Sequence, residues 1–381
     1  MQCRTLLLSA GLALALAAPV RAQFAPGAPD EADTPLDAAT RSAAIESLAV
    51  AVRDRYVFPD KGAELAKVLK RRAAKKEYDR ITSTREFADS LTAHMQAATH
   101  DLHMRVHYRL EPLPRDAGDE DRPSESERRR QLAIEQLRNF GFDQVRRLPG
   151  NVGYLDLRMF SGTPEAQATA VAAMNFLGNC DALIVDLRRN GGGSPGMIQT
   201  LLSYLVEPGR RLHFNDFYER EGDRWVQYYT SPFVPGPRLA GKPVYVLTSA
   251  LTGSAAEEFS YDIQTHKLGT LIGATTAGAA NPGGFVRLTD HLAAFVANGR
   301  AVNPVTKTNW EGVGVKPDMA VAPHEALRTA HVRAIEELKQ KPRDAEHDAF
   351  LGRALEAAKK TPDDKPEDFE RAVRRKAGQP G

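Results

Sequence analysis

The pattern of apolar and polar positions divides the chain into three regions. Between about residues 36 and 95, apolar residues recur at three- and four-residue spacing among many charged residues, which predicts helices with one buried face. From about residue 151 to 321, short and nearly all-apolar runs alternate with helical patterns. Beyond residue 325 the chain is charged again, with Ala and Leu at helical spacing to about residue 357.

The middle region predicts an α/β domain with a mostly parallel sheet. A strand buried on both faces reads as a continuous apolar run, and strands that alternate with helices are typical of parallel sheets. A charged hairpin that contains Trp225 and Tyr228 interrupts the alternation. The expected strands are 152–157, 182–187, 243–248 and 270–273, and the expected helices are 164–177, 195–206 and 254–266.

Composition sets the boundaries between these regions. Prolines and charged residues without apolar content mark exposed connections, and residues 112–126 have this composition. The predicted segments are a signal peptide at 1–22, a flexible leader at 23–35, a helical N-terminal domain at 36–110, a linker and short helix at 111–148, the α/β domain at 149–325 and a C-terminal helical tail at 326–381.

The first residues have the layout of a cleaved secretory signal. Arg4 precedes an apolar run from Thr5 to Ala18, and small residues stand three positions and one position before Gln23. The run is too short for a permanent span and lacks the polar face of a retained surface anchor. No other window approaches about 18 uninterrupted apolar residues, so no stable membrane insertion is expected. We expect export to the periplasm or the extracellular space.

Charge and cysteine content narrow the function classes. The 51 Lys and Arg fall by two when the signal is removed, to 49, which matches the 49 Asp and Glu. A formally neutral mature chain is not built to coat nucleic acid, which needs a strongly basic surface. Only Cys180 remains after cleavage, so no internal disulfide is possible, and a core of this size does not need one.

Ser254 stands where an apolar strand meets the start of a helix. A hydroxyl there lies in the positive field of the helix N-terminus, beside amides that lack helical partners. An acyl-transfer nucleophile needs these conditions, because the amide of Ala255 can meet an anion that forms on a substrate carbonyl oxygen. The alternative is a simple N-cap, with Glu257 completing a capping box.

A glycine-rich loop, 186–196, follows a buried strand and opens a helix. In an α/β sheet this loop lies at the carboxyl edge of the strands, where ligands bind, with Gly191 and Gly192 offering accessible amides. The loop matches neither the phosphate-binding nor the dinucleotide-binding glycine pattern, so no nucleotide cofactor is expected. A tight turn without function is the alternative.

Three histidines cluster at His100, His103 and His107. If residues 104–108 form a strand, His103 and His107 share a face and His100 does not, so this spacing is a poor metal site. We therefore expect no metal, and a general base is the more useful role for one of these imidazoles.

Six segments together resemble a known family. They resemble the tail-specific (C-terminal processing) serine peptidases, in the branch similar to interphotoreceptor retinoid-binding protein and the tricorn protease core. The resemblance covers about residues 36–325 and implies a crotonase/ClpP-like catalytic core, with 149–325 as the peptidase domain. The segments, in family order, are 101–106, 150–156, 186–193, 252–259, 278–284 and 303–318.

The resemblance implies a role for each site residue. Ser254 is the nucleophile, His103 the general base and Glu311 the carboxylate that orients the base. The amides of Ala255 and of the glycine loop at 191–193, in particular those of Gly191 and Gly192, form the oxyanion hole. Such a triad is recognised by geometry, so the order His, Ser, Glu is no obstacle. For Glu311, an exposed loop acid is the alternative.

The chain departs from the family pattern in three places. The processing branch uses a Ser/Lys dyad, but residues 278–281 contain no lysine, which disfavours that mechanism. The same branch carries a PDZ domain, and the roughly 40 residues between Tyr108 and Gly150 are too few for one. The tricorn-type tetrad has a serine directly before the histidine, where this chain has Leu102, and loss of that hydrogen bond is expected to weaken activity.

The sequence therefore predicts an exported serine-type peptidase of endopeptidase or carboxy-terminal processing type. Its expected partner is a peptide or an unfolded protein, cleaved without a cofactor. The alternative is a non-catalytic protein on the same scaffold that binds a hydrophobic ligand or a peptide. The retained Ser254, His103 and Glu311 favour the enzyme, whereas Leu102 favours the binding protein. The oligomeric state cannot be read from the sequence.

Overall fold

The computed structural model describes residues 33–113, 125–341 and 344–369. The expected signal peptide and almost all of the expected leader lie outside the described residues, as does part of the expected linker. Among the helices that are described, none combines the length and the apolar character needed to cross a membrane.

A six-stranded sheet forms the centre of the molecule, in the order β12-β8-β7-β4-β3-β2. All neighbours pair in parallel except β2 and β3, which are antiparallel. Its continuous apolar strands are the ones that the sequence predicts; β2 and β12 are additional. The bounds are β2 Phe142–Leu148, β3 Val152–Leu157, β4 Ala182–Asp186, β7 Val244–Thr248, β8 Thr270–Gly273 and β12 Met319–Ala320.

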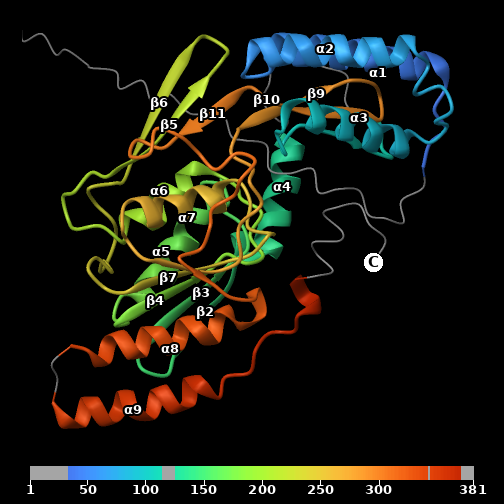
Figure 1. Cartoon of the computed structure of the whole chain (residues 1–381). Helices are drawn as coiled ribbons and strands as arrows, with labels where there is room; N and C mark the ends of the chain where they lie inside the picture. The colour runs from blue at the N-terminus through green and yellow to red at the C-terminus, as the bar shows by residue number, and fades with distance from the viewer. Residues whose placement is uncertain (1–32, 114–124, 342–343, 370–381) are drawn as a thin grey trace, which may run out of the picture.

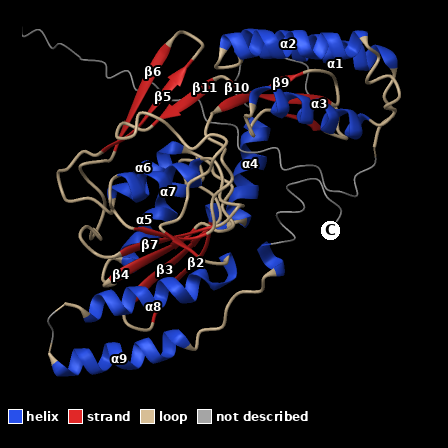
Figure 2. Ribbon diagram, viewed as in Figure 1, coloured by secondary structure: helices blue, strands red, loops and turns tan. Residues whose placement is uncertain are grey.

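Helices cover both faces of this sheet. On one face α5 (Ala166–Leu177), α6 (Pro195–Ser203) and α7 (Ala255–Thr265) share a core with the sheet. On the other face lies α8 (Ala326–Lys339), with α9 (Ala345–Lys359) beyond it (Figures 1 and 2). The fold class that the sequence predicts is confirmed: a mixed α/β protein with a mostly parallel sheet and C-terminal helices.

The N-terminal region is helical, as expected, but a small sheet completes it. Helices α1 (Ala38–Arg55), α2 (Pro59–Ala74) and α3 (Thr84–Thr99) pack on a sheet in the order β1-β10-β9. Strand β1 is Arg105–Tyr108, and β10 and β9 are Leu292–Ala297 and Gly283–Arg287. The apolar pattern does not predict β9 and β10 because they are short and rich in Gly and Ala, so their pairing depends on packing against distant helices.

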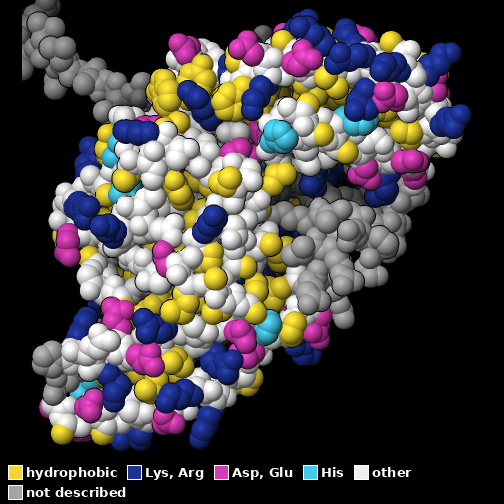
Figure 3. Space-filling model, in the orientation of Figure 1, with side chains coloured by type: hydrophobic (Ala, Val, Ile, Leu, Met, Phe, Trp, Pro, Cys, Tyr) yellow, Lys and Arg dark blue, Asp and Glu magenta, His cyan; other side chains and the backbone are white. Residues whose placement is uncertain are grey.

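The expected charged hairpin is present. Strands β5 (His213–Glu219) and β6 (Arg224–Tyr229) form it, and β11 (Gly299–Val302) pairs with β5. Helix α4 (Glu125–Leu137) and the 3₁₀ turns η1 (Asn139–Gly141) and η2 (Pro323–Glu325) complete the described elements. On the face shown in Figure 3, acidic and basic side chains are interspersed, in keeping with the near-neutral charge.

Candidate active site

Three loops meet at the carboxyl edge of the parallel sheet, where ligands bind in open α/β sheets. They follow β4, β7 and β8. Hydrogen bonds join the first loop to the second: the Thr252 hydroxyl donates to the Leu187 carbonyl (2.8 Å), and the Gly253 amide donates to the Asn190 carbonyl (3.0 Å). The third loop joins through the Ala277 amide, which donates to the Thr252 carbonyl (2.9 Å).

Ser254 occupies the N-cap of α7 with an unusual backbone. Its φ is +53° and its ψ is −122°, whereas N-cap residues normally lie in the extended region. A non-glycine residue held at positive φ costs of order 1–3 kcal/mol and persists only where the surroundings impose it. The expected capping-box bond is present, since the Ser254 amide donates to Glu257 Oε2 (2.8 Å). A cap alone does not require this strained backbone.

Gly192 lies directly against Ser254. A Cβ added at Gly192 would be 2.7 Å from Ser254 Cβ and 3.0 Å from the Ala255 nitrogen, and the glycine φ is +116°. Only glycine permits this approach. The Gly192 amide, which was expected to be an oxyanion donor, donates to Asn190 Oδ1 within the glycine loop (2.8 Å).

The amides of Ala255 and Gly191 remain as candidate oxyanion donors. Ala255 is the first residue of α7, so its amide has no partner within the helix. Gly191 is exposed, and a Cβ added there would meet nothing within 4 Å.

His103 and Glu311, far apart in sequence, lie together with Asp101. The nearest side-chain nitrogen or oxygen atoms of these three residues are all within 4.8 Å of one another. Asp101 is 1% exposed, and its Oδ1 accepts the His103 amide (3.0 Å). Its Oδ2 accepts Asn281 Nδ2 (2.9 Å) and the Tyr56 hydroxyl (3.4 Å). Asp101 is not among the residues that the sequence marks as functional, because its partners are remote in the chain.

Two carboxylates hold the loop 276–281, and this loop connects Ser254 to His103. Glu257, in the serine helix, accepts the Gly278 amide (2.6 Å) and the Ala279 amide (2.9 Å). Glu311 accepts the next two amides, those of Ala280 (2.6 Å) and Asn281 (3.0 Å). Of these four successive amides, the first two donate to the acid in the helix of Ser254, and the last two donate to the acid beside His103. Glu311 is therefore not a freely exposed loop acid.

Leu102 contributes its backbone at the position where the tricorn-type tetrad has a serine. Its amide donates to Glu311 Oε1 (3.3 Å), and its side chain is 42% exposed. The backbone of the residue before His103 thus donates a hydrogen bond to the Glu311 carboxylate.

Burial and like charge set the protonation of the two acids. Burial, followed by the negative charge of Asp101, raises the pKa of Glu311 to about 7, although three amides favour the ionised form. Burial also raises the pKa of Asp101, against hydrogen bonds from Asn281, the His103 amide and Tyr56. Because the two carboxylates repel each other, the charge on either one disfavours ionisation of the other.

The histidines of the sequence cluster separate in the structure. His100 caps α3 with a φ of +58°, and His107 in β1 packs edge-on against Phe285, with ring centroids 5.3 Å apart. Burial, aided by neighbouring arginines, lowers the pKa of His107 to about 4. Among the described residues, Asp101, His103 and Glu311 form the group that could hold a metal ion, and neither His100 nor His107 belongs to it.

A separate hollow lies at the other end of the strands. It has a volume of about 520 Å³ and is lined at the amino ends of β7 and β8 by Pro243, Val244, Gly269 and Thr270, among others. The loops described above follow the carboxyl ends of these strands, so this hollow is not part of the candidate site.

Two family models match the chain. The model of peptidase family S41 matches residues 151–321, and a model described as the N-terminal domain of that family in eukaryotic IRBP matches residues 38–139. The first match contains Ser254, Glu311 and the glycine loop, and the second contains Asp101 and His103.

Three solved structures resemble this chain at low sequence identity, and the first of them shows a shared fold. A lipoprotein from Streptococcus agalactiae is 14% identical, with 79% of this chain and 98% of that chain covered and a TM-score of 0.52. A putative peptidase from Parabacteroides merdae is 21% identical over 74% of this chain and 90% of that one, with a TM-score of 0.48. The photosystem II D1 C-terminal processing protease is 17% identical over 85% and 99%, with a TM-score of 0.47.

Proposed function

This chain belongs to peptidase family S41, and from that premise we propose that it is a serine peptidase that cleaves peptide bonds through an acyl-enzyme. Ser254 is the nucleophile, His103 the general base and Glu311 the orienting carboxylate. The observation that carries the proposal is the backbone of Ser254, which is strained at a helix N-terminus and pressed against Gly192. Such strain concentrates at functional positions.

The reaction follows from the chemistry of these groups. His103 removes the proton from Ser254 Oγ as the oxygen attacks a peptide carbonyl carbon. The resulting oxyanion accepts hydrogen bonds from the amides of Ala255 and Gly191. His103 then gives its proton to the leaving amine, and the acyl-enzyme remains. A water molecule, deprotonated by His103, releases the acid and restores Ser254.

Glu311 and Asp101 supply negative charge beside His103. A charged imidazole forms when His103 accepts the serine proton, and a fixed anion nearby stabilises it. Glu311 is fixed by the amides of Leu102, Ala280 and Asn281, so little reorganisation is needed when the charge develops. In this proposal Asp101 is a positioning residue, because it accepts the His103 backbone amide.

The substrate is a peptide or an unfolded protein segment, cut within the chain or near its carboxyl terminus, and the enzyme acts after export. The roughly neutral charge supports selection by local pockets rather than by long-range steering. No Lys stands at residues 278–281, and their amides are held by Glu257 and Glu311, which supports a histidine base over a lysine base.

A binding protein for a hydrophobic ligand or peptide is the second candidate. The observation that favours it is a pair of exposed apolar residues near Glu311. Leu102, whose amide donates to Glu311, is 42% exposed, and Val313, two residues after Glu311, is 66% exposed. A binding surface has no use for the strained Ser254, which favours the enzyme.

Hydrolysis of denatured casein and of fluorogenic peptides by the full-length protein tests the proposal. The wild type is expected to release new amino termini, and Ser254→Ala is expected to release none. Equal hydrolysis by both proteins would refute the role of Ser254. Stoichiometric binding of a hydrophobic probe by a protein that never cleaves peptides would establish the second candidate instead.

A further inference from the structure

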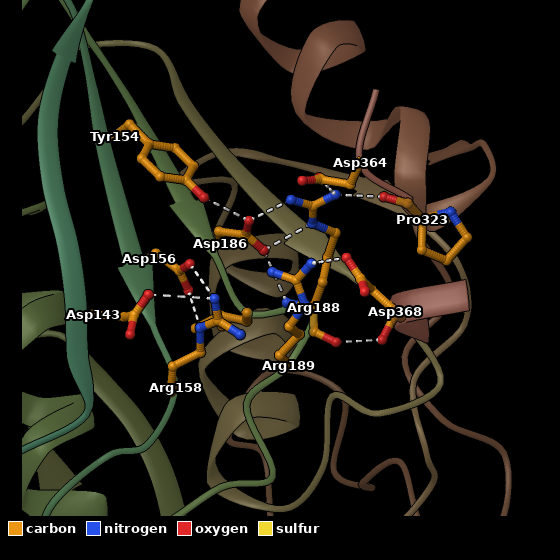
Figure 4. Close-up of polar contacts among 12 residues, drawn as sticks. Asp143, Tyr154, Asp156, Arg158, Asp186, Arg188, Arg189, Pro323, Asp364 and Asp368 are labelled. Carbon is orange, nitrogen blue, oxygen red and sulfur yellow. Dashed lines mark hydrogen bonds and ion pairs between the residues drawn. The ribbon is translucent and has the colours of Figure 1, made fainter. Parts of the chain in front are cut away.

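The C-terminal segment 360–369 returns to the start of the glycine loop. After α9 the chain runs back to the beginning of α8, where the Asp364 amide donates to the His324 carbonyl (3.1 Å) (Figure 1). In Figure 4, Asp364 and Asp368 face Arg188 and Arg189 from outside the sheet. These arginines directly follow β4 and precede the glycines that approach Ser254.

Arg188 is a buried cation with partners from three parts of the chain. Its side chain is 1% exposed. Asp186 binds the guanidinium through both oxygens, at 2.9 Å to Nε and 2.5 Å to Nη2. Nη1 donates to the Pro323 carbonyl (2.6 Å) and pairs with Asp364 Oδ2 (2.7 Å). Asp364 is therefore the second carboxylate, after Asp186, that pairs with this guanidinium.

Phe369 and Asp368 extend the contact to Arg189. The Phe369 ring centroid is 5.1 Å from the Arg188 guanidinium carbon and 4.7 Å from that of Arg189, within the range of cation–π attraction. Asp368 Oδ2 is 3.5 Å from Arg189 Nη2. The segment thus holds both arginines by charge and by stacking.

Charge balance shows why Asp364 matters to Arg188. Burial opposes ionisation of Asp186, but hydrogen bonds and charge from Arg188 outweigh it and hold the Asp186 pKa below its usual range. Burial likewise opposes the charge on Arg188, and Asp186 and then Asp364 raise its pKa. Removal of one partner from a buried ion group leaves an uncompensated charge, which the surrounding chain relieves by moving.

A short series of hydrogen bonds and contacts joins Arg188 to Ser254. The Arg188 carbonyl accepts the Ser249 hydroxyl (2.5 Å), in the turn that leads to Ser254. Two residues after Arg188, the Asn190 side chain accepts the Gly192 amide (2.8 Å). Gly192 is the residue packed against Ser254 Cβ.

We propose that residues 364–369 are a positioning element of the candidate active site, in which Asp364 and Phe369 hold Arg188 and so keep the glycine loop in register with Ser254. The proposal rests on the proposed peptidase function. It differs from simple stabilisation of the fold because it acts on the transition state, whose oxyanion donors lie on this loop and at the start of α7.

A matched pair of variants tests the proposal. Asp364→Ala removes the carboxylate that pairs with Arg188 (2.7 Å), and Asp363→Ala removes the carboxylate one residue earlier, which pairs with Arg328 (2.9 Å). For Asp364→Ala we expect kcat to fall about ten- to a hundredfold, the effect of small misplacement of reacting groups. KM is expected to stay within about twofold, because ground-state binding is unchanged. Asp363→Ala is expected to match the wild type, and Asp364→Glu to recover part of kcat.

Hydrogen exchange supplies a readout that does not depend on activity. Amides of residues 188–193 are expected to exchange faster in Asp364→Ala than in Asp363→Ala at a temperature where both are folded. If Asp364→Ala does not fold, Phe369→Leu, which keeps the ion pairs and loses the stacking, is expected to show a smaller effect in the same direction.

The outcomes separate this proposal from the proposed function. An unchanged kcat with unchanged exchange at 188–193 would overturn the positioning role, and so would equal losses in both variants. If Ser254→Ala hydrolyses peptides as the wild type does, the peptidase assignment fails. In that case hydrogen exchange at residues 188–193 tests only whether residues 364–369 hold the glycine loop. Faster exchange in Asp364→Ala supports this, and unchanged exchange overturns it.

Discussion

Two serines stand at equivalent places in the fold and differ in backbone conformation. Ser194 opens α6 after β4, and Ser254 opens α7 after β7, so both follow parallel strands of the same sheet. Ser194 has a φ of −99°, and its hydroxyl accepts the Gly196 amide (3.2 Å), as an ordinary cap does. Ser254 has a φ of +53° and is packed against Gly192. This difference shows that backbone conformation distinguishes an ordinary N-cap serine from a candidate nucleophile.

The surroundings of the two serines strengthen this contrast. Through residues 276–281, the Ser254 turn is connected to Glu311 and the His103 loop, where burial raises carboxylate pKa values. The Ser194 turn packs on Gly162 and Phe160, where a Cβ added at Gly162 would be 3.1 Å from Ser194 Cβ. The turn of Ser254 thus belongs to a network of backbone amides and carboxylates, whereas the turn of Ser194 contacts neighbouring backbone.

Among changes that leave Ser254 in place, the largest expected effect comes from removing the charge beside His103. Glu311→Gln is expected to lower kcat by about 10³- to 10⁴-fold, because the imidazolium formed in the reaction loses its anion. Steady-state kinetics on a fluorogenic peptide measure this change. Glu337→Gln is the control and is expected to retain activity. Glu337 lies on α8 and accepts a hydrogen bond from the Tyr245 hydroxyl (2.6 Å). Equal activity in the two variants would remove Glu311 from the site.

A smaller loss is expected when the glycine beside Ser254 gains a side chain. Gly192→Ala places a Cβ 2.7 Å from Ser254 Cβ at a φ of +116°, so the loop must shift. We expect kcat to fall about 10²- to 10³-fold, the size of a lost oxyanion contact, because the shifted loop carries the adjoining Gly191 amide with it. Gly196→Ala is the matched control, since its Cβ would meet only Ser194 Oγ at 3.5 Å. Full activity of Gly192→Ala would show that the close contact has no part in the reaction.

The pH dependence tests the raised pKa of Glu311. Activity is expected to increase as pH rises through about 7, where Glu311 loses its proton. Stability changes in the opposite sense. The folded pKa is about 7 and the ordinary value is 4.5, so between these the folded state binds more protons and the free energy of unfolding falls as pH rises. Urea unfolding at pH 5 and pH 7.5 checks this, and an identical pH slope in Glu311→Gln would contradict it.

The smallest effect is expected at the other serine. Ser194→Ala removes a side-chain cap from α6 and is expected to lower the free energy of unfolding by about 1 kcal/mol. Peptide hydrolysis is expected to continue at the wild-type rate. Urea denaturation and kinetics on the same preparation measure the two quantities. A strong loss of activity in a folded Ser194→Ala would break the contrast between the serines.

The sequence predicts the elements whose signal is local. The buried strands 152–157 and 244–248 appear as continuous apolar runs, and the start of α7 follows from a capping box. The strands β9 and β10 are not predicted, because these Gly- and Ala-rich segments are stabilised by packing against helices that are distant in sequence. The pairing of β1 with β10 likewise joins residues about half the chain apart, such as Arg105 and Phe295.

The candidate site shows the same limit. Ser254, His103 and Glu311 could be named because a family resemblance carries them together. Asp101 could not, because its contacts with Asn281 and Tyr56 join residues far apart in sequence. The commitment of the Gly192 amide to Asn190 and the positive φ of Ser254 are backbone properties that side-chain types do not encode.

Reaction with a fluorophosphonate is the most direct test of the central claim that Ser254 is a nucleophile activated by its turn. The reagent labels a hydroxyl that has a general base and an oxyanion hole, and peptide mass spectrometry identifies the modified residue. One adduct per chain on Ser254, absent from Ser254→Ala and unchanged in Ser194→Ala, is the predicted result. An adduct on another residue, or none on a protein that cleaves peptides, would contradict the account.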